Sequence, residues 1–223
     1  AGLIGSHLIE SLLAKDFNIT CIDNFISGQK KNIAAFLDNP HFNFIEADAS
    51  LDPHTYLVEN TNFSYIFHLA SPASPVGYGQ HPIETYRVNA FGTHYLLELA
   101  RKQNARILFS STSEVYGDPL IHPQTETYWG NVNPNGIRSC YDESKRFGEM
   151  ACMTFHREFN LDTRIIRIFN TYGPRNDPND GRVVPNFIMQ ALKNEPLTIY
   201  GDGSQTRSFC YVKDLVTGIE QMM

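Results

Sequence analysis

Short apolar runs alternate with longer amphipathic segments along most of the chain. The runs predict strands at residues 19–22, 42–46, 65–69, 106–110 and 163–169. Around them, apolar residues recur at helical spacing and predict helices at about 6–15, 82–102 and 140–159. Strands that alternate with helices of this length indicate an α/β protein with a Rossmann-type, doubly wound and mostly parallel sheet.

The pattern becomes less regular from about residue 171 onward. A segment rich in Pro, Asp, Gly and Asn at 176–182 predicts a loop. A helix at 185–193, a short strand at 197–200 and a final helix from residue 214 are predicted after it. We therefore expect an α/β domain over residues 1–170 and the start of a smaller, interleaved substrate-binding region over residues 171–223.

The first residues combine two glycines with the start of a helix. Gly2 and Gly5 form the second half of the dinucleotide fingerprint Gly-x-Gly-x-x-Gly. Gly2 would let the backbone approach a pyrophosphate at the helix N-terminus, and Gly5 would permit close helix–strand packing. Because the first glycine and the strand before it are absent, we expect the sequence to be a fragment of a longer chain.

An acidic residue stands where that fingerprint expects one. Asp23 directly follows the predicted strand at 19–22. Its carboxylate could accept hydrogen bonds from both ribose hydroxyls and would repel a 2′-phosphate. The pattern therefore favours NAD over NADP.

A second polar group follows the predicted strand at 106–110. Its members are Ser110, Thr112, Ser113 and Glu114. Open α/β sheets bind ligands at the carboxyl ends of their strands. Further along, Tyr141 and Lys145 are four residues apart and share one helix face. An ammonium beside a phenol lowers the pKa of the phenol, so Tyr141 could serve as an acid/base near neutral pH.

Composition excludes several other classes of protein. A net charge of −6 and a pI near 5.7, with no basic run, argue against a nucleic-acid-binding protein. The 4 cysteines and 8 histidines show no metal-ligand spacing, so we expect no metal site and reduced, buried thiols. No apolar run approaches the length of a membrane span. We expect a cytoplasmic protein and no membrane contact in this segment, and an anchor upstream of Ala1 stays open.

Seven stretches of the chain together carry a family resemblance. They read His-Leu-Ala-Ser-Pro-Ala-Ser-Pro at 68–75, Ser-Thr-Ser-Glu-Val-Tyr-Gly-Asp-Pro at 111–119, Tyr-Trp-Gly-Asn-Val-Asn-Pro at 128–134, Cys-Tyr-Asp-Glu-Ser-Lys at 140–145, Ile-Phe-Asn-Thr-Tyr-Gly-Pro-Arg at 168–175, Asn-Asp-Gly-Arg-Val-Val at 179–184 and Gly-Ser-Gln-Thr-Arg at 203–207. On these residues the chain resembles the nucleotide-sugar branch of the extended short-chain dehydrogenase/reductase family. Within that branch it is similar to the UDP-glucuronate decarboxylases, or UDP-xylose synthases.

One position separates this group from the sugar-nucleotide 4,6-dehydratases. The dehydratases carry Thr-Asp-Glu, whose Asp protonates a departing hydroxyl. Here Ser113 stands between Thr112 and Glu114. Serine cannot be that acid at neutral pH, and a decarboxylase needs none because CO₂ leaves without a proton.

The resemblance implies a reaction and a role for each residue. UDP-glucuronate would be oxidised at C4 with NAD, lose CO₂, and be reduced again to UDP-xylose. Tyr141 would be the base, Lys145 would lower its pKa and hold the nicotinamide ribose, and Thr112 would bind the 4-oxygen. Ser113 and Glu114 would manage the water or proton at C5.

The same resemblance implies the binding residues and an assembly. The NAD site would comprise Gly2, Leu3, Ile4, Gly5, Asp23, Asn24, Phe25, Ser27, Gly28, Asp48, Ala49, Leu69, Ala70, Ser71, Ser110, Tyr141, Lys145 and Thr171. The UDP-sugar site would include Asn170, Arg182 and Arg207. The helices predicted at 82–102 and 140–159 resemble those of the family's dimeric four-helix bundle, so a homodimer is expected.

Two alternatives remain at this point. One is another NAD-dependent nucleotide-sugar enzyme, either a 4,6-dehydratase of the dTDP-glucose type or a 4-epimerase. The other is a non-catalytic dinucleotide-binding fragment. Ser113 disfavours the first, and the set formed by Thr112, Tyr141 and Lys145 disfavours the second.

Overall fold

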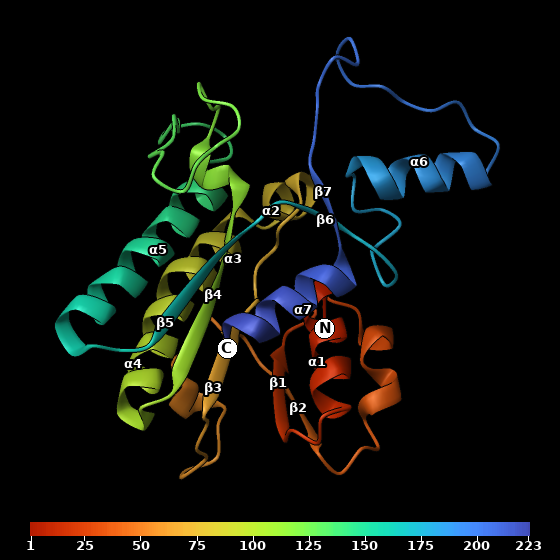
Figure 1. Cartoon of the computed structure of the whole chain (residues 1–223). Helices are drawn as coiled ribbons and strands as arrows, with labels where there is room; N and C mark the ends of the chain where they lie inside the picture. The colour runs from red at the N-terminus through yellow and green to blue at the C-terminus, as the bar shows by residue number, and fades with distance from the viewer.

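The computed structural model describes residues 1–223, and its strands are all paired in parallel. The central sheet has the order β3 (Tyr65–His68), β4 (Arg106–Thr112), β5 (Thr163–Ile168). Two strand pairs accompany it: β1 (Ile19–Asp23) with β2 (Phe42–Glu46), and β6 (Asn170–Tyr172) with β7 (Phe209–Tyr211). The predicted parallel α/β class is confirmed, and the structure divides the predicted sheet into these separate parts (Figure 1).

Helices connect the strands, and several differ from the prediction in their bounds. The α-helices are α1 (Leu3–Leu13), α2 (Pro75–Gln80), α3 (Pro82–Arg87), α4 (Thr93–Gln103), α5 (Ser139–Phe159), α6 (Val183–Leu192) and α7 (Val212–Met222). Short 3₁₀ turns occupy η1 (Lys30–Asn32), η2 (Ala34–Phe36), η3 (Pro53–Thr55) and η5 (Ser113–Tyr116). The single helix predicted at 82–102 is interrupted by a π-helical turn, η4 (Val88–Gly92).

A close backbone approach accompanies the π-helical turn. A Cβ atom on Gly92 would lie 2.6 Å from the carbonyl oxygen of Ala49. Only glycine therefore lets the turn contact the loop after β2 without a steric clash. The predicted strand at 197–200 is wrong, because no other segment pairs with it, and β7 forms further along instead.

Side chains of β4 point alternately to the two faces of the central sheet and pack against a helical layer on each. Ile107 and Phe109 point into a core with α4 and α5, whereas Leu108 points to the opposite face, against Val212 of α7. This period of two is what a strand buried on both faces requires. In α5, Gly148 allows the close contact, because a Cβ there would lie 2.2 Å from the Phe109 ring.

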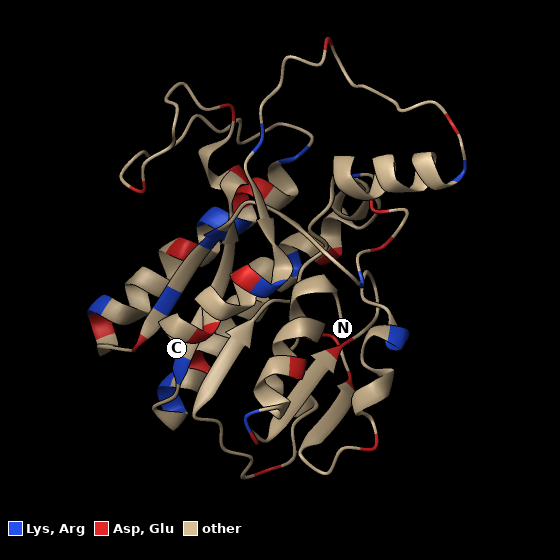
Figure 2. Ribbon diagram, turned by 45° about the vertical axis from the view of Figure 1, so that its right-hand side comes forward, with Lys and Arg blue, Asp and Glu red and all other residues tan.

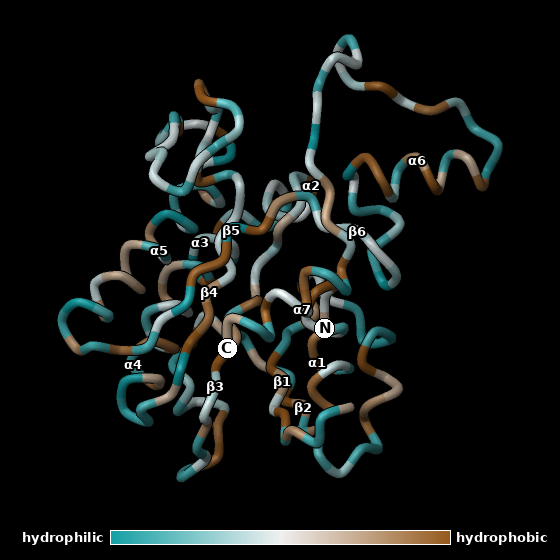
Figure 3. Tube along the Cα trace, in the orientation of Figure 1, coloured by the Kyte–Doolittle hydropathy of each residue, from teal (hydrophilic) through white to brown (hydrophobic).

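The C-terminal residues divide into a packed and an extended part. Helix α7 packs against α1, while α6 and the chain after it extend away from the sheets (Figures 1 and 3). Acidic and basic residues are interspersed along the same elements (Figure 2). None of the helices combines the length and apolar character that crossing a bilayer demands. The division at residue 170 stays a prediction.

Candidate active site

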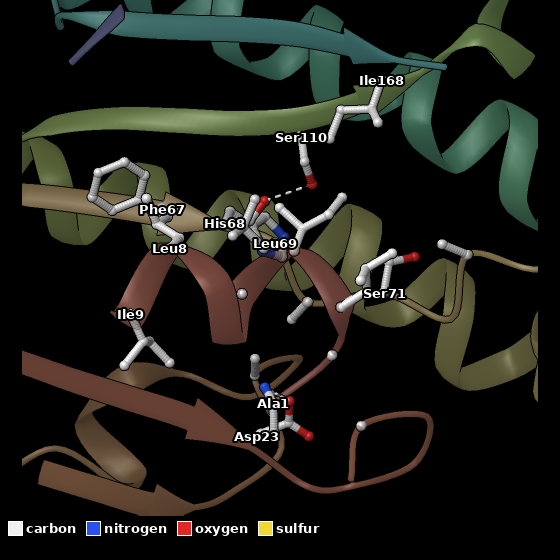
Figure 4. Close-up of a pocket in the computed structure, with 18 of the residues that line it drawn as sticks. Ala1, Leu8, Ile9, Asp23, Phe67, His68, Leu69, Ser71, Ser110 and Ile168 are labelled. Atoms are coloured by element: carbon white, nitrogen blue, oxygen red, sulfur yellow. Dashed lines mark hydrogen bonds and ion pairs between the residues drawn. The ribbon is translucent and has the colours of Figure 1, made fainter. Parts of the chain in front are cut away.

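One large cavity, of about 1130 Å³, is lined by residues at both ends of β1 and β3 and at the carboxyl end of β4. Nearly all of the predicted site residues line it, including all five proposed for catalysis and all three proposed for the substrate. Figure 4 shows Asp23 on one wall and Leu69, Ser71 and Ser110 on the opposite wall. The fold thus brings together residues from Gly2 to Arg207.

Three predicted cofactor residues lie outside this lining: Asn24, Phe25 and Asp48. Asn24 and Asp48 cap their own turns, because their side-chain oxygens accept hydrogen bonds from the amides of Ile26 at 3.1 Å and Ser50 at 2.8 Å. Phe25 packs on the ring of Phe44 at a centroid distance of 5.2 Å. Their local role is to shape the two loops, and their contact with a cofactor stays a prediction.

The N-terminus of α1 faces the cavity with unpaired amides. Gly2 is its N-cap, no side chain caps it, and no acidic residue lies in the first turn. A Cβ on Gly2 would meet no atom within 4 Å, so the space beside the helix end is open. Free amides and the positive end of the helix dipole make such a terminus an anion site. A Cβ on Gly5 would also meet no atom within 4 Å, and the packing role of Gly5 stays a prediction.

Asp23 ends β1 at the mouth of this helix terminus. Its carboxylate accepts a hydrogen bond from the amide of Phe25 at 2.7 Å and lies 2.6 Å from the nitrogen of Ala1. A Cβ on Gly28 would come within 2.9 Å of the same carboxylate. Glycine at position 28 therefore keeps the carboxylate group of Asp23 from being displaced.

Hydrogen bonds orient the polar side chains at the carboxyl end of β4. The Ser110 hydroxyl donates to the His68 carbonyl at 2.8 Å, which joins β4 to β3 (Figure 4). Thr112 is the N-cap of η5, and its hydroxyl accepts from the amide of Glu114 at 3.2 Å. The Ser113 hydroxyl donates to the Glu114 carboxylate at 3.2 Å. The three residues therefore form one hydrogen-bonded unit.

Tyr141 and Lys145 lie on the first turns of α5, both buried. Burial raises the pKa of Tyr141 to about 12, although a hydrogen bond from Thr112 and the charge of Arg182 oppose the rise. The expectation that Lys145 lowers this pKa is not met. The Lys145 ammonium lies 5.8 Å from the centre of the Tyr141 ring and donates to the Ser110 carbonyl at 2.7 Å. Burial also lowers the pKa of Lys145 to about 7, so the amine is only partly protonated near neutral pH.

Sequence reasoning missed two residues of the cavity wall. Tyr78 of α2 stacks on Tyr141, with centroids 5.0 Å apart and an angle of 12° between the planes. Arg138, the N-cap of α5, forms an ion pair with Glu114. Ser74 caps α2 and Pro75 begins it, a helix-start signal that could have predicted this short helix. The i, i+3 spacing of Arg138 and Tyr141 places both at the same end of α5.

The proposed substrate residues also line the cavity. Arg182 forms an ion pair with Asp180, and the Arg207 side chain donates to the carbonyl of its neighbour Thr206 at 2.8 Å. The Asn170 amide donates to the Ser208 carbonyl at 3.0 Å and so joins β6 to the segment before β7.

The fold and this cavity define a Rossmann-type α/β protein with an uncapped helix terminus, an acidic strand end and a Tyr/Lys pair. The sequence profile of the NAD dependent epimerase/dehydratase family matches residues 1–223. The chain therefore belongs to the NAD dependent epimerase/dehydratase family, which confirms the resemblance found in the sequence.

Curated relatives refine this placement. UDP-glucuronic acid decarboxylase 4 of Arabidopsis thaliana is 53% identical over 223 residues, which is 100% of this chain and 49% of that protein. UDP-glucuronic acid decarboxylase 1 of Xenopus tropicalis is 48% identical over 223 residues, which is 100% of this chain and 52% of that protein. The chain spans about half the length of these relatives.

Solved structures share the fold at lower identity. The dTDP-glucose 4,6-dehydratase of Streptomyces venezuelae, with NAD and TYD bound, has a TM-score of 0.85 and 28% identity over 98% of this chain and 68% of that one. The UDP-glucuronic acid 4-epimerase of Bacillus cereus, in complex with UDP-glucuronic acid and NAD, has a TM-score of 0.81 and 30% identity over 98% of this chain and 69% of that one.

Proposed function

We propose that the protein containing this chain is an NAD-dependent UDP-glucuronate decarboxylase, a carboxy-lyase that produces UDP-xylose. The observation that carries the proposal is the unit of Thr112, Ser113 and Glu114 beside Tyr141 in one cavity. Its support is the 53% identity to a plant decarboxylase over the whole chain.

The residues at the α1 end of the cavity fit NAD. The open, uncapped helix terminus at Gly2 suits a pyrophosphate, and Asp23 suits the adenosine ribose. The amide of Phe25 holds one oxygen of Asp23, so the carboxylate is oriented before any ligand arrives. When bound, NAD⁺ supplies the positive charge of its oxidised ring and the acceptor for the C4 hydride, which is later returned.

The chain's own residues carry the proton steps. Tyr141 takes the proton of the 4-hydroxyl as C4 is oxidised, and the Thr112 hydroxyl holds the 4-oxygen. The hydrogen bond from Thr112 and the positive charge of Arg182 both favour the phenolate over the phenol. Deprotonation therefore depends on further positive charge, because the pKa of Tyr141 stays at about 12 even with these two contributions.

Loss of CO₂ follows from the ketone at C4. The carboxylate on C5 is β to that ketone, which accepts the electrons that the departing CO₂ leaves behind. Donors at the 4-oxygen stabilise the resulting enolate, and this stabilisation is expected to be the largest contribution. Glu114 and Ser113 then direct a proton from water to C5, and Tyr141 returns its proton to the 4-oxygen as C4 is reduced again. No acid is needed for a leaving hydroxyl, which agrees with serine at position 113.

Anionic groups of the substrate need placed cations in a protein with a net charge of −6. Arg182 and Arg207 line the cavity, and guanidinium groups suit a diphosphate. We assign them to the UDP moiety, with Asn170 beside them. Arg182 is already oriented by Asp180.

The decisive experiment incubates the full-length protein with NAD and carboxyl-labelled UDP-glucuronate. Stoichiometric labelled CO₂ together with UDP-xylose supports the proposal. Conversion of dTDP-glucose to a 4-keto-6-deoxy sugar, without CO₂ from UDP-glucuronate, would establish a dehydratase. UDP-galacturonate formed without CO₂ would establish a 4-epimerase. Bound NAD without any turnover would establish a non-catalytic binding protein.

A homodimer is part of the same proposal. Large apolar side chains are exposed along α3, η4 and α5, and they are Ile83, Tyr86, Phe91, Phe147, Met150, Met153 and Phe159. Helices α3 and α5 lie side by side (Figure 1), so these residues can meet a second copy as a four-helix bundle. Light scattering should give the mass of a dimer, and Met150→Glu should give a monomer, whereas the exposed Leu192→Glu on α6 should leave the mass unchanged.

A further inference from the structure

Arg138 connects two of the side chains that matter most in the cavity. Its guanidinium forms an ion pair with the Glu114 carboxylate and lies 5.9 Å from the centre of the Tyr78 ring. Tyr78 in turn stacks on Tyr141. Arg138 is 48% exposed at its side chain and lines the cavity, so a ligand can reach it.

The position of the carboxylate in a uronate sugar brings it close to this arginine. The carboxylate of UDP-glucuronate is attached to C5, the neighbour of C4. A sugar whose C4 lies at Tyr141 and Thr112 therefore brings its carboxylate toward Ser113 and Glu114, which follow Thr112 directly. Two carboxylates at close range repel each other strongly in a partly buried site. A cation between them removes that repulsion.

Arg138 is the arginine whose position suits this task. A guanidinium has five donors in a planar fork and can bond two carboxylates at once. Arg182 is paired with Asp180, and Arg175 is paired with Glu10 and donates to the Ser6 carbonyl beside α1. Among these arginines of the cavity wall, Arg138 is the one paired with a proposed catalytic carboxylate.

We propose that Arg138 determines specificity for a uronic acid, by bonding the C6 carboxylate of the sugar together with Glu114. This inference rests on the proposed function and names a residue that recognises its substrate. Arg138 thereby keeps Glu114 in the cavity as the charged sugar enters. A neutral sugar, which has a 6-hydroxyl instead, gains nothing from Arg138.

The test measures binding without turnover. Every protein in the experiment is full-length, saturated with NAD and carries Tyr141→Phe, which prevents turnover. Calorimetry gives its affinities for UDP, UDP-glucose and UDP-glucuronate. The variants are Arg138→Met, Glu114→Gln and the two combined. Arg101→Met is the matched control, because Arg101 also pairs with a glutamate, Glu98, and lies over an aromatic ring, Phe159, but outside the cavity.

The expected result is selective. Arg138→Met should weaken the affinity for UDP-glucuronate about tenfold or more, and should change the affinities for UDP and UDP-glucose less than about twofold. Adding Glu114→Gln should restore most of the loss, because the repelling charge is then absent. Arg101→Met should change none of the three.

Other outcomes overturn the inference in distinct ways. Equal weakening of all three ligands by Arg138→Met would reduce Arg138 to a structural role, and an unchanged preference for UDP-glucuronate would remove it from recognition. Both outcomes leave the proposed function standing. A parent protein that binds UDP-glucose as well as UDP-glucuronate, and whose Tyr141-containing form releases no CO₂, would instead defeat the proposed function itself.

Discussion

The ring of Tyr78 lies parallel to the ring of Tyr141, with their centroids 5.0 Å apart. Tyr78 belongs to the short helix α2 and Tyr141 to the start of α5, so the stack joins two segments 63 positions apart in the sequence. Both side chains are buried. The stack therefore limits how far the Tyr141 ring can rotate, and Tyr78 is a positioning residue for the proposed base.

Replacing Tyr78 tests this relationship. Tyr78→Leu removes a stacking contact worth roughly 1 kcal/mol and should lower kcat about fivefold, with a smaller change in KM. Tyr78→Phe is the control. It keeps the ring and its stack on Tyr141 and removes only the hydroxyl, so kcat and KM should change much less than in Tyr78→Leu. Steady-state CO₂ release measures all three proteins, and a fully active Tyr78→Leu variant would contradict the role.

Tyr141→Phe should separate cofactor binding from turnover. The phenylalanine keeps the ring and its stack on Tyr78, and only the acid/base group is lost. We expect kcat to fall by about 10²-fold or more, because proton transfer by a positioned side chain contributes about that factor. The amount of NAD that co-purifies, measured by absorbance after denaturation, should equal that of the parent protein. Retained CO₂ release would refute the assignment of Tyr141.

Local pattern predicted most of the elements. The apolar run of Ile107, Leu108 and Phe109 predicted β4, and the four-residue spacing of Tyr141 and Lys145 predicted a shared helix face, which the structure confirms. These features depend on neighbours in the sequence. For the same reason Thr112, Ser113 and Glu114 were predicted together at one strand end.

Features that depend on distant contacts could not be predicted in this way. The π-helical turn at Gly92 occurs where the loop at Ala49 approaches the helix. Residues 197–200 have strand-like composition and no partner, so they form no strand. The raised pKa of Tyr141 reflects burial by the whole fold, which a Tyr-x-x-x-Lys spacing cannot reveal.

Lys145 should make stability depend on pH. Burial lowers its pKa from 10.5 to about 7, so the folded protein binds fewer protons than the unfolded chain between these values. Stability therefore increases as pH rises through this window, and the full penalty of burying the charge applies below pH 7. Lys145→Met has no such charge. From pH 7 to 9.5 the parent should gain on the order of 3 kcal/mol relative to this variant.

Denaturant titrations of the two proteins at several pH values give this difference directly. The window ends before the unfolded tyrosine at position 141 begins to ionise near pH 10, so that group does not interfere. Parallel curves for the parent and Lys145→Met would show that the ammonium of Lys145 is not desolvated by the fold.

Gly148→Ala should destabilise the protein although alanine is the better helix former. Its Cβ would lie 2.2 Å from the Phe109 ring, which is fully buried and cannot move aside. We expect the free energy of unfolding to fall by about 1–3 kcal/mol, typical of an overpacked core.

Gly218 in α7 is the matched control, because a Cβ there would meet no atom within 4 Å. Gly218→Ala should therefore stabilise the protein by about 0.5–1 kcal/mol through its helix propensity alone. Thermal unfolding of both variants measures the two effects, and an equal gain in Tm for both would mean that α5 does not pack on β4 as closely as described.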